Sequence, residues 1–469
     1  MRQLMWFRSD LRIYDNPALA AAMQKGECIA VYCLCHEQWD AHDVSPAKRS
    51  LIVRQLVELE SALSRLNVPL IVLDCKIFER VPEALADLCA RLGIGSLCFN
   101  HEYELNERRC ARAVRDRLVD AGVEVAACHD QCALKPGSVL NNDGKMYKVF
   151  SAFKRAYLKA FTEQTRAMMN RPTKQSPSDI PSELDALDPK GVASPWDDQW
   201  PAGEDEAHDR LNRFVEHRIK QYKTRRDFPA DEATSELSPY LAVGAISTVQ
   251  CLHAAITMNH GELSGGHPGI DTWISELIWR DFYRHLLYSF PELCQYQAFK
   301  PETDALPWRH DEALFEAWKS GKTGYPIVDA AMRQLSERAW MHNRLRMVCA
   351  MFLTKHLFID WRWGERYFMQ TLVDGDLASN NGGWQWSAST GVDAVPYFRI
   401  FNPVRQSERF DPDGEFVRKY VKELASVEGK SVHMPDNETA RKLGYPEPIV
   451  DHKTAVAQTK TWFKELSGA

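Results

Sequence analysis

The run from Asp374 to Gly391 combines side chains that could bind a ligand. It reads Asp-Gly-Asp-Leu-Ala-Ser-Asn-Asn-Gly-Gly-Trp-Gln-Trp-Ser-Ala-Ser-Thr-Gly and keeps neither a helical nor a strand period, so core packing alone explains it poorly. Its adjacent asparagines offer donors and acceptors to a ring with mixed edges, and its adjacent glycines let the backbone approach a bound group closely. The alternative is a turn between two core helices in which Trp384 and Trp386 are packing residues.

A second candidate stretch, from Trp273 to Tyr283, is expected to be a helix with polar groups on one stripe. The stripe holds an indole, an acid, a base and a phenol: Trp273, Glu276, Arg280 and Tyr283. Such a stripe on a mostly apolar helix indicates a pocket wall. The alternative is a helix in which Glu276 and Arg280 form an ion pair, worth about 0.2–0.5 kcal/mol.

Two further segments could line the same pocket or bind phosphate. In the run from Trp340 to Met347, Asn343 and Met347 share one helical face. Ser238 is the expected N-cap of a helix with Pro239 at its first position, so that the helix start could bind phosphate oxygens. The same pattern is found at any capped helix and does not by itself indicate a phosphate site. Arginines from separate segments are interleaved with aromatic residues, as suits a phosphate-binding groove: Arg225, Arg226, Arg280, Arg344 and Arg399.

The composition bounds the class of protein and its partners. With 469 residues, 45% hydrophobic and 26% charged, the chain predicts a soluble globular protein of two or three domains. No apolar run is long enough to cross a bilayer and the N-terminus lacks the order of a signal peptide, so we expect no membrane partner and a cytoplasmic location. A net charge of -6 means that a nucleic acid must be bound by a local basic patch. The twelve cysteines lack metal-site spacing and predict reduced core thiols.

The elements that must position these residues fall into two kinds. Five short β-rich runs alternate with helical stretches and begin near Leu4, Cys28, Leu70, Ser96 and Glu124. This α/β alternation predicts a parallel sheet with helices on both faces over residues 1–131, without a glycine-rich dinucleotide loop after the first strand. The charged run beginning at Arg8 would lie at the carboxyl edge of the sheet, where ligands usually bind. The alternative is a surface loop with salt bridges. Residues 132–205 predict a connector and residues 206–469 a larger all-α domain.

Five ordered motifs together resemble the DNA photolyase and cryptochrome family over essentially the whole chain. They are Thr234-Ser-Glu-Leu-Ser, Trp273-Ile-Ser-Glu-Leu-Ile-Trp-Arg, Gly324-Tyr-Pro-Ile-Val-Asp-Ala-Ala-Met-Arg, Trp340-Met-His-Asn-Arg and Asp374-Gly-Asp-Leu-Ala-Ser-Asn-Asn-Gly-Gly-Trp-Gln-Trp. Within the family, the chain is most similar to the bacterial class I cyclobutane pyrimidine dimer photolyases. The resemblance implies an antenna domain, a helical FAD-binding domain and light-driven electron transfer from reduced FAD to a flipped-out dimer in UV-damaged DNA, by a monomer.

The resemblance also assigns roles to residues at matching positions. Those implied to bind FAD, with Asn380 beside the flavin N5, are Tyr222, Thr234, Ser235, Glu236, Leu237, Ser238, Trp273, Asn343, Asp374, Gly375, Asp376 and Asn380. Those implied to line the lesion pocket are Glu276, Trp279, Asn343, Met347 and Trp386. Those implied to contact DNA are Arg226, Arg280, Arg344, Arg399 and Gln406. The implied electron relay from the surface to the flavin is Trp308, Trp361 and Trp384.

A second chromophore follows from the same resemblance. It is a 5,10-methenyltetrahydrofolate antenna, implied to bind at His42, Asn106, Glu107 and Cys294. Gln295 replaces a lysine that some relatives pair with the antenna's glutamates, which bears on the tightness of folate binding and not on its presence.

Two other functions compete with light-driven repair. A cryptochrome would sense light without repair, but Asn380 and the lesion-pocket residues are intact here. An enzyme acting without light on the α/β domain has no triad, metal cluster or phosphate loop to support it. Enzymes for (6-4) photoproducts place a histidine pair in the lesion pocket, where this chain has Asn343 and Met347, so cyclobutane dimers are the expected lesion.

Overall fold

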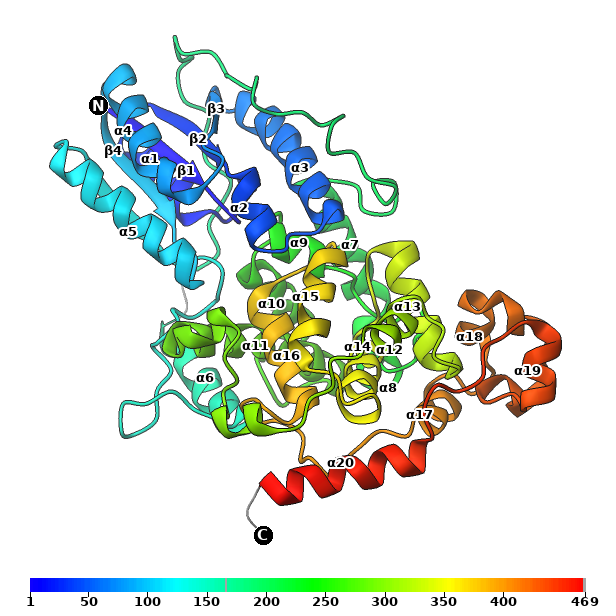
Figure 1. Cartoon of the computed structure of the whole chain (residues 1–469). Coiled ribbons are helices and arrows are strands. Elements are labelled where there is room, and N and C mark those ends of the chain that lie inside the picture. Colours follow the sequence, from blue (N-terminus) through cyan, green and yellow to red (C-terminus); the bar gives the residue numbers. More distant parts are fainter. Residues whose placement is uncertain (165–166, 467–469) are drawn as a thin grey trace. The chain divides into compact units, whose positions relative to one another are not determined.

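The computed structural model describes residues 1–164 and 167–466 and divides the chain into two compact units (Figure 1). The first unit comprises Met1–Lys220, Ser235–Cys294 and Val373–Ala378. The second comprises Gln221–Thr234, Gln295–Leu372 and Ser379–Ala469. The short segment Val373–Ala378 therefore belongs to a different unit from the residues on both sides of it.

A five-stranded parallel sheet forms the centre of the first unit, in the order β3-β2-β1-β4-β5. Its strands are β1 (Arg2–Phe7), β2 (Cys28–Leu34), β3 (Leu70–Asp74), β4 (Ile94–Asn100) and β5 (Glu124–Cys128). Every residue of β2 is buried, which requires cover on both faces of the sheet. The five predicted strands and their parallel arrangement are confirmed.

Helices surround this sheet and continue into the later segments of the first unit. They are α1 (Pro17–Lys25), α2 (His36–Ala41), α3 (Pro46–Ser64), α4 (Val81–Leu92), α5 (Leu105–Asp120), α6 (Phe150–Gln164), α7 (Glu204–His217), α9 (Ser238–Val243), α10 (Thr248–Met258) and α11 (Pro268–Ser289). One face of the sheet packs with α4 and α5 in a single apolar cluster. The hydroxyl of Ser45 caps α3 by accepting from the Lys48 amide, and Pro46 fits its first turn.

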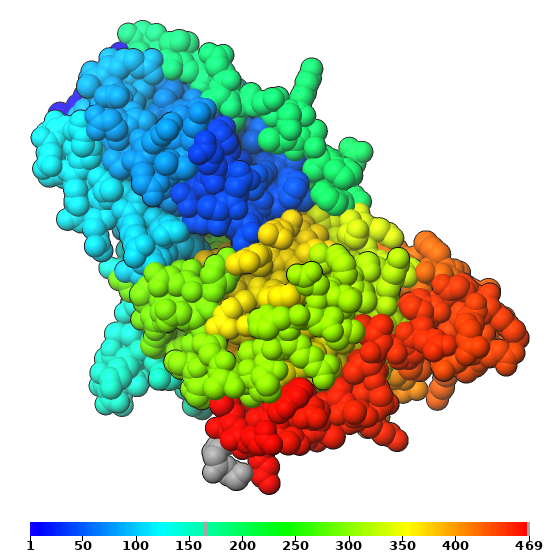
Figure 2. Space-filling view, viewed as in Figure 1, coloured from blue at the N-terminus to red at the C-terminus, as the bar shows by residue number. Residues whose placement is uncertain are grey.

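The second half of the connector predicted over residues 132–205 lies along an edge of the sheet. The Glu183 carbonyl accepts from the Val72 amide at 2.8 Å, and Glu183 donates to Leu70 at 2.9 Å, so the connector bonds the outer side of β3. Gln175 exchanges side-chain hydrogen bonds with the backbone of Cys28. Figures 1 and 2 show this segment on the surface beside β3 and α3. Residues 165–166 of the predicted connector lie outside the described residues.

The second unit is built from helices around one large apolar core. Its helices are α8 (Tyr222–Arg225), α12 (Glu312–Lys319), α13 (Pro326–Arg338), α14 (Asn343–Met351), α15 (Trp361–Thr371), α17 (Pro403–Phe410), α18 (Glu415–Tyr420), α19 (Asn437–Leu443) and α20 (His452–Leu466). A π-helical turn, η5 (Phe352–His356), follows α14. Helix α16 (Leu377–Ala388) begins in the segment assigned to the first unit and continues in the second.

Two local expectations are wrong. Most of the run from Asp374 to Gly391 is the helix α16, so the alternative of a turn between two core helices is wrong, even though the run shows no helical period. Ser238 is the first residue of α9 and not its cap, because Leu237 before it already has near-helical angles and accepts no side-chain capping bond. Helix α9 has only six residues, so its start is a weak anion site.

The buried cation Arg12 joins three segments of the first unit. Its guanidinium donates to Asp130 at 2.5 Å and to the carbonyls of Tyr14, Asp15 and Gly244. Arg12 and Asp130 have side chains only 1% and 2% exposed. Removal of either charge would take a buried ion-pair partner from the other.

We therefore predict that Arg12→Met destabilises the protein by about 3–5 kcal/mol, because it removes the guanidinium that pairs with the buried carboxylate of Asp130. The measurement is the urea unfolding midpoint of the variant beside that of the native protein. Arg109→Met, which removes an exposed arginine from α5, is the control and should change stability by less than about 0.5 kcal/mol. Equal midpoints for the two variants would contradict the prediction.

Candidate functional site

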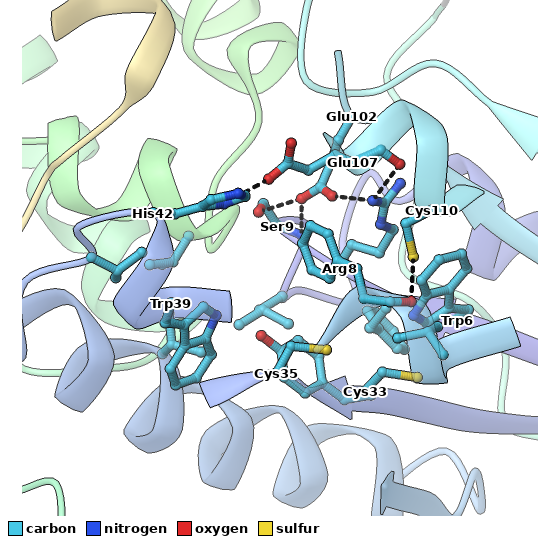
Figure 3. A pocket seen from close by; sticks show the side chains of 18 of the residues that line it. Trp6, Arg8, Ser9, Cys33, Cys35, Trp39, His42, Glu102, Glu107 and Cys110 are labelled. Atoms are coloured by element: carbon cyan, nitrogen blue, oxygen red, sulfur yellow. Dashed lines mark hydrogen bonds and ion pairs between the residues drawn. The ribbon is translucent and has the colours of Figure 1, made fainter. Parts of the chain in front are cut away.

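A pocket opens in the first unit at the carboxyl ends of β1 and β2 (Figure 3). Trp6 and Arg8 come from the end of β1 and the residues after it, Cys33 and Cys35 from the end of β2, and Trp39 from α2. This is the ligand edge of a parallel sheet. The charged run beginning at Arg8 therefore lines a pocket and is not a plain surface loop.

Three of the four predicted antenna residues lie together, and two of them, His42 and Glu107, line this pocket. His42 Nδ1 is 3.3 Å from Glu107 Oε1, and its Nε2 lies 3.0 Å from the amide of Asn106 and 2.9 Å from that of Gln38. Burial lowers the pKa of His42, but the hydrogen bond and charge of Glu107 raise it above its ordinary value. Burial likewise acts upward on Glu107, whereas His42 lowers its pKa below the ordinary value. Both shifts favour an imidazolium–carboxylate pair.

Cys294, the fourth antenna residue, lies beside the start of α5. Burial raises the pKa of its thiol to about 12, although a hydrogen bond with the backbone of Leu105 opposes the shift. Glu104, the residue before Leu105, is also perturbed: burial and the charge of Glu107 raise its pKa to about 7. The structure thus brings the antenna candidates together within the first unit.

The sequence placed Arg8 at the ligand edge but not among the antenna residues, and Glu102, which also lines this pocket, was not predicted. Arg8 Nη2 is 2.6 Å from Glu102 Oε2, and Glu102 Oε1 accepts from the hydroxyl of Ser9 at 2.5 Å. The Arg8 guanidinium lies over the Trp6 ring, while its Nη1 is buried without a hydrogen-bond partner among the described residues. The charged residues after the first strand were the sequence feature that indicated this site. Their partner Glu102 follows β4, and its position next to Arg8 could be predicted only from the order of strands in the sheet.

The segment Val373–Ala378 supplies three of the predicted FAD residues to the first unit. Arg284 of α11 pairs with Asp376, and Lys48 of α3 donates to the carbonyl of Gly375 at 2.6 Å. Arg284 Nε and Nη1 are buried without hydrogen-bond partners in the part of the chain that the structure describes. Neither Lys48 nor Arg284 was predicted, because nothing in the local sequence links residues so far apart.

The predicted stripe on α11 is a helical face, and its members differ in environment. Trp273 is buried against Phe214, and Trp279 stacks on Phe150 with ring centres 3.6 Å apart. Arg280 donates to the carbonyl of Gln131 at 2.6 Å and also to Thr248 and Leu241. Its guanidinium is thus largely occupied by internal acceptors.

A buried polar network surrounds Asn380 in the second unit. Asn380 donates to the carbonyl of Glu365 at 2.9 Å, and Asn381 donates to the carboxylate of the same residue at 2.9 Å. Gln385 continues the network by donating to Asn381. Burial raises the pKa of Glu365 to about 7, and its Oε2 has no hydrogen-bond partner among the described residues. A side-chain carbon added at Gly383 would meet no atom within 4 Å, which leaves room beside this helix.

Helix α14 presents Asn343 at its exposed start and Met347 one turn later. His342, just before the helix, is buried: its Nδ1 accepts from the Arg344 amide, and burial lowers its pKa to about 4. Arg344 Nη2 forms an ion pair with Asp227 at 2.8 Å, and Arg226 Nε lies 3.9 Å from the same residue. One carboxylate therefore lies within ion-pair distance of both arginines.

Other DNA candidates and the relay tryptophans also lie in the second unit. Arg399 is exposed, whereas Gln406 has a buried Oε1 without a partner among the described residues. Trp361 and Trp384 are buried and Trp308 is half-buried, as a path from core to surface requires. The Trp384 ring contacts Trp318 and Phe368, and no ring contact joins the three relay tryptophans within residues 1–164 and 167–466.

The remaining candidates divide between the units. Tyr222 and Thr234 lie in the second, and Ser235, Glu236, Leu237 and Ser238 in the first. Within the described residues, no cluster of three or more His, Cys, Asp or Glu side chains is arranged to bind a metal ion. In the same residues, no helix combines the length and apolarity needed to cross a membrane.

Two family models match the chain. Residues 3–173 match the model described as DNA photolyase, and residues 273–465 match the FAD binding domain of DNA photolyase. A deoxyribodipyrimidine photo-lyase of Vibrio cholerae is 44% identical over 99% of this chain and 100% of its own length. A protein of the same name from Escherichia coli is 45% identical over 97% of each chain.

Solved structures agree with these matches. A bacterial class III photolyase from Agrobacterium tumefaciens has a TM-score of 0.89 and 35% identity, covering 100% of this chain and 98% of its own. A Synechocystis cryptochrome has a TM-score of 0.86 at 25% identity, covering 98% of this chain and 99% of its own.

Glu365 allows a test of the buried network in the second unit. Its pKa of about 7 lies above the value of an unfolded glutamate, so the folded state binds the extra proton between about pH 4.5 and 7. The stabilisation is complete below the unfolded pKa and is lost as pH rises through 7. We predict that native protein loses stability from pH 5 to 8 relative to Glu365→Gln, measured by urea unfolding. Glu312→Gln, at an exposed glutamate, should run parallel to the native protein; parallel curves for Glu365→Gln would refute the shifted pKa.

Proposed function

The chain belongs to the DNA photolyase family, and on this premise we infer the reaction and propose a role for each group of residues. The protein repairs cyclobutane pyrimidine dimers in UV-damaged DNA with light, and it binds FAD. The observation that carries this conclusion is identity of 44–45% with deoxyribodipyrimidine photo-lyases over nearly the full length of both chains. Signalling without repair is the weaker alternative, because the cryptochrome relative is only 25% identical.

The residues proposed to hold FAD fit that molecule chemically. Bound FAD, reduced and excited by light, supplies the electron that splits the dimer. In the first unit the donors left unpaired on Arg284, beside Asp376, suit a ligand rich in acceptors. In the second unit Asn380 and the open space at Gly383 suit a flat ring. We assign FAD binding to Tyr222, the run Thr234–Ser238, Trp273, Asn343, Asp374, Gly375, Asp376 and Asn380.

For the dimer, we propose binding by indoles and polar edges. Trp279 and Trp386 would stack on the flipped-out bases, while Glu276 and Asn343 would hydrogen bond to their carbonyl edges and stabilise added negative charge. Met347 supplies an apolar wall. The nearby His342 is buried and accepts the Arg344 amide, so it is poorly placed to act as a general acid.

Contacts to the DNA backbone are proposed for arginines and one amide. Asp227 holds Arg226 and Arg344 together, so that the two guanidinium groups present a fixed pair of charges despite a net charge of -6. Arg399 is exposed and available, and Gln406 would contribute hydrogen bonds. Arg280 contributes mainly through its fixed position, since its donors already have internal acceptors.

The antenna is proposed to be 5,10-methenyltetrahydrofolate, bound at His42, Asn106, Glu107 and Cys294. Support comes from the His42–Glu107 pair, whose imidazole and carboxylate both line the pocket. We also propose a cytoplasmic monomer with an antenna domain over 1–131, a connector over 132–205 and a catalytic domain over 206–469.

The lesion preference gives the direct test of function. We predict that reduced, illuminated enzyme restores thymines in oligonucleotides carrying a cyclobutane dimer and none in those carrying a (6-4) photoproduct, because no proton donor is proposed in the pocket. Glu276→Ala should slow repair about 10- to 100-fold without abolishing it, as loss of a hydrogen bond to charge implies. Glu262→Ala, at an exposed glutamate, should leave the rate unchanged. Turnover of the (6-4) substrate would overturn the pocket assignment.

A separate variant tests the electron relay. Trp384→Phe should block light-driven reduction of oxidised FAD, because indole is the readily oxidised side chain, while pre-reduced enzyme still repairs dimers. The measurement is loss of the oxidised flavin absorption under blue light with an external thiol. Trp363→Phe, which replaces a half-buried indole of α15, should keep photoreduction. Normal photoreduction by Trp384→Phe would remove Trp384 from the relay.

A further inference from the structure

The loop around Gly375 is held by two cations from other parts of the first unit. Lys48 of α3 lies 327 residues away in sequence, and its Nζ donates to the Gly375 carbonyl at 2.6 Å. Arg284 of α11 pairs with the carboxylate of Asp376. One contact thus fixes the loop backbone and the other fixes a side chain in it.

Lys48 is half-buried, so its ammonium group is partly removed from water. Burial lowers the pKa of its amine, while Asp376, Glu104 and Glu102 act to raise it. A buried ammonium is stable only where acceptors and negative charge replace its water. Here the Gly375 carbonyl and Asp376 supply both, so Lys48 and this loop depend on each other.

Arg284 provides an independent sign that a ligand belongs here. Its side chain is 3% exposed, and only Nη2 is engaged by Asp376. Its Nε and Nη1 have no hydrogen-bond partner within the described residues. Unsatisfied buried donors of a charged group are costly, and ligands commonly satisfy them.

Gly375 makes the loop need such support. A glycine gives the backbone more conformational freedom than any other residue. Without other contacts, the entropy cost of ordering the loop would reduce the free energy of ligand binding. A loop fixed in advance binds more tightly because less entropy is lost on binding.

We propose that Lys48 and Arg284 are positioning residues for FAD, which hold the Asp374–Asp376 loop in its binding conformation. This rests on the proposed role of that loop in FAD binding. Because Lys48 belongs to the α/β part of the chain, that part contributes directly to FAD affinity.

Two measurements test the proposal on the full-length protein. FAD titrated into apoprotein, followed by flavin fluorescence, should show a Kd about 10- to 100-fold higher for Lys48→Met and for Arg284→Met. Arg284→Lys, which keeps the charge, should recover part of the affinity. In the apoprotein, hydrogen exchange at Gly375 and Asp376 should be faster in Lys48→Met than in the native chain, a readout that needs no bound FAD.

The neighbouring Arg49 on α3 supplies the matched control. It pairs with Asp40 and not with the loop, so Arg49→Met should leave both readouts unchanged. Lys48→Gln replaces Lys48→Met, with the same expectation, if the latter does not fold. Unchanged FAD affinity and exchange in the Lys48 variant would overturn the proposal.

Asp376→Asn separates this proposal from the one on which it rests. If Asp376→Asn weakens FAD binding while Lys48→Met and Arg284→Met do not, only the positioning role fails. If Asp376→Asn also leaves FAD affinity unchanged, the loop itself is not part of the FAD site. Effects of Lys48→Met and Asp376→Asn that are smaller in combination than their sum would support a shared role.

Discussion

The buried charge of Arg12 constrains much of the first unit, because a guanidinium group shielded from water needs protein atoms as its hydrogen-bond acceptors. It finds them after β1, at Asp130 beyond β5, and at Gly244 at the end of α9. Ser247 adds a hydrogen bond to Asp15 in the same region. The ligand edge of the sheet is therefore also the place where the helical segments of this unit attach. The loop at Gly375 attaches near the same edge, through Lys48.

Local sequence patterns predicted the sheet well because its determinants are local. Strand β2 is a continuous apolar run, and it begins at Cys28, where a β-rich run was expected to begin. Helix α16 was missed for the opposite reason. Adjacent asparagines and glycines give it weak intrinsic propensity. It is stabilised by tertiary contacts, such as the hydrogen bonds from Asn381 to Glu365 and from Gln385 to the Gln297 carbonyl, and by the burial of Trp384.

The candidate residues divide in the same way. His42 and Glu107 came from the family resemblance, and the structure brings them into contact. Contacts between residues far apart in sequence were not predicted. Arg8 meets Glu102 across adjacent strands, and Lys48 meets Gly375 across most of the chain, so neither pairing has a sequence period to reveal it. The division of the chain into units escaped for the same reason, since Val373–Ala378 joins the first unit through such contacts.

The connector's bonds to β3 have a consequence beyond the native state. An unpaired edge strand exposes amides and carbonyls that can recruit a strand of another molecule, and β3 is an apolar edge that begins Leu-Ile-Val-Leu. Glu183 occupies the amide of Val72 and the carbonyl of Leu70, leaving less of that edge to template aggregation. During synthesis on the ribosome, however, β3 emerges more than a hundred residues before Glu183. Until Glu183 is synthesised, the edge of β3 is unpaired and prone to aggregation, and only a chaperone or rapid packing of neighbouring segments can shield it.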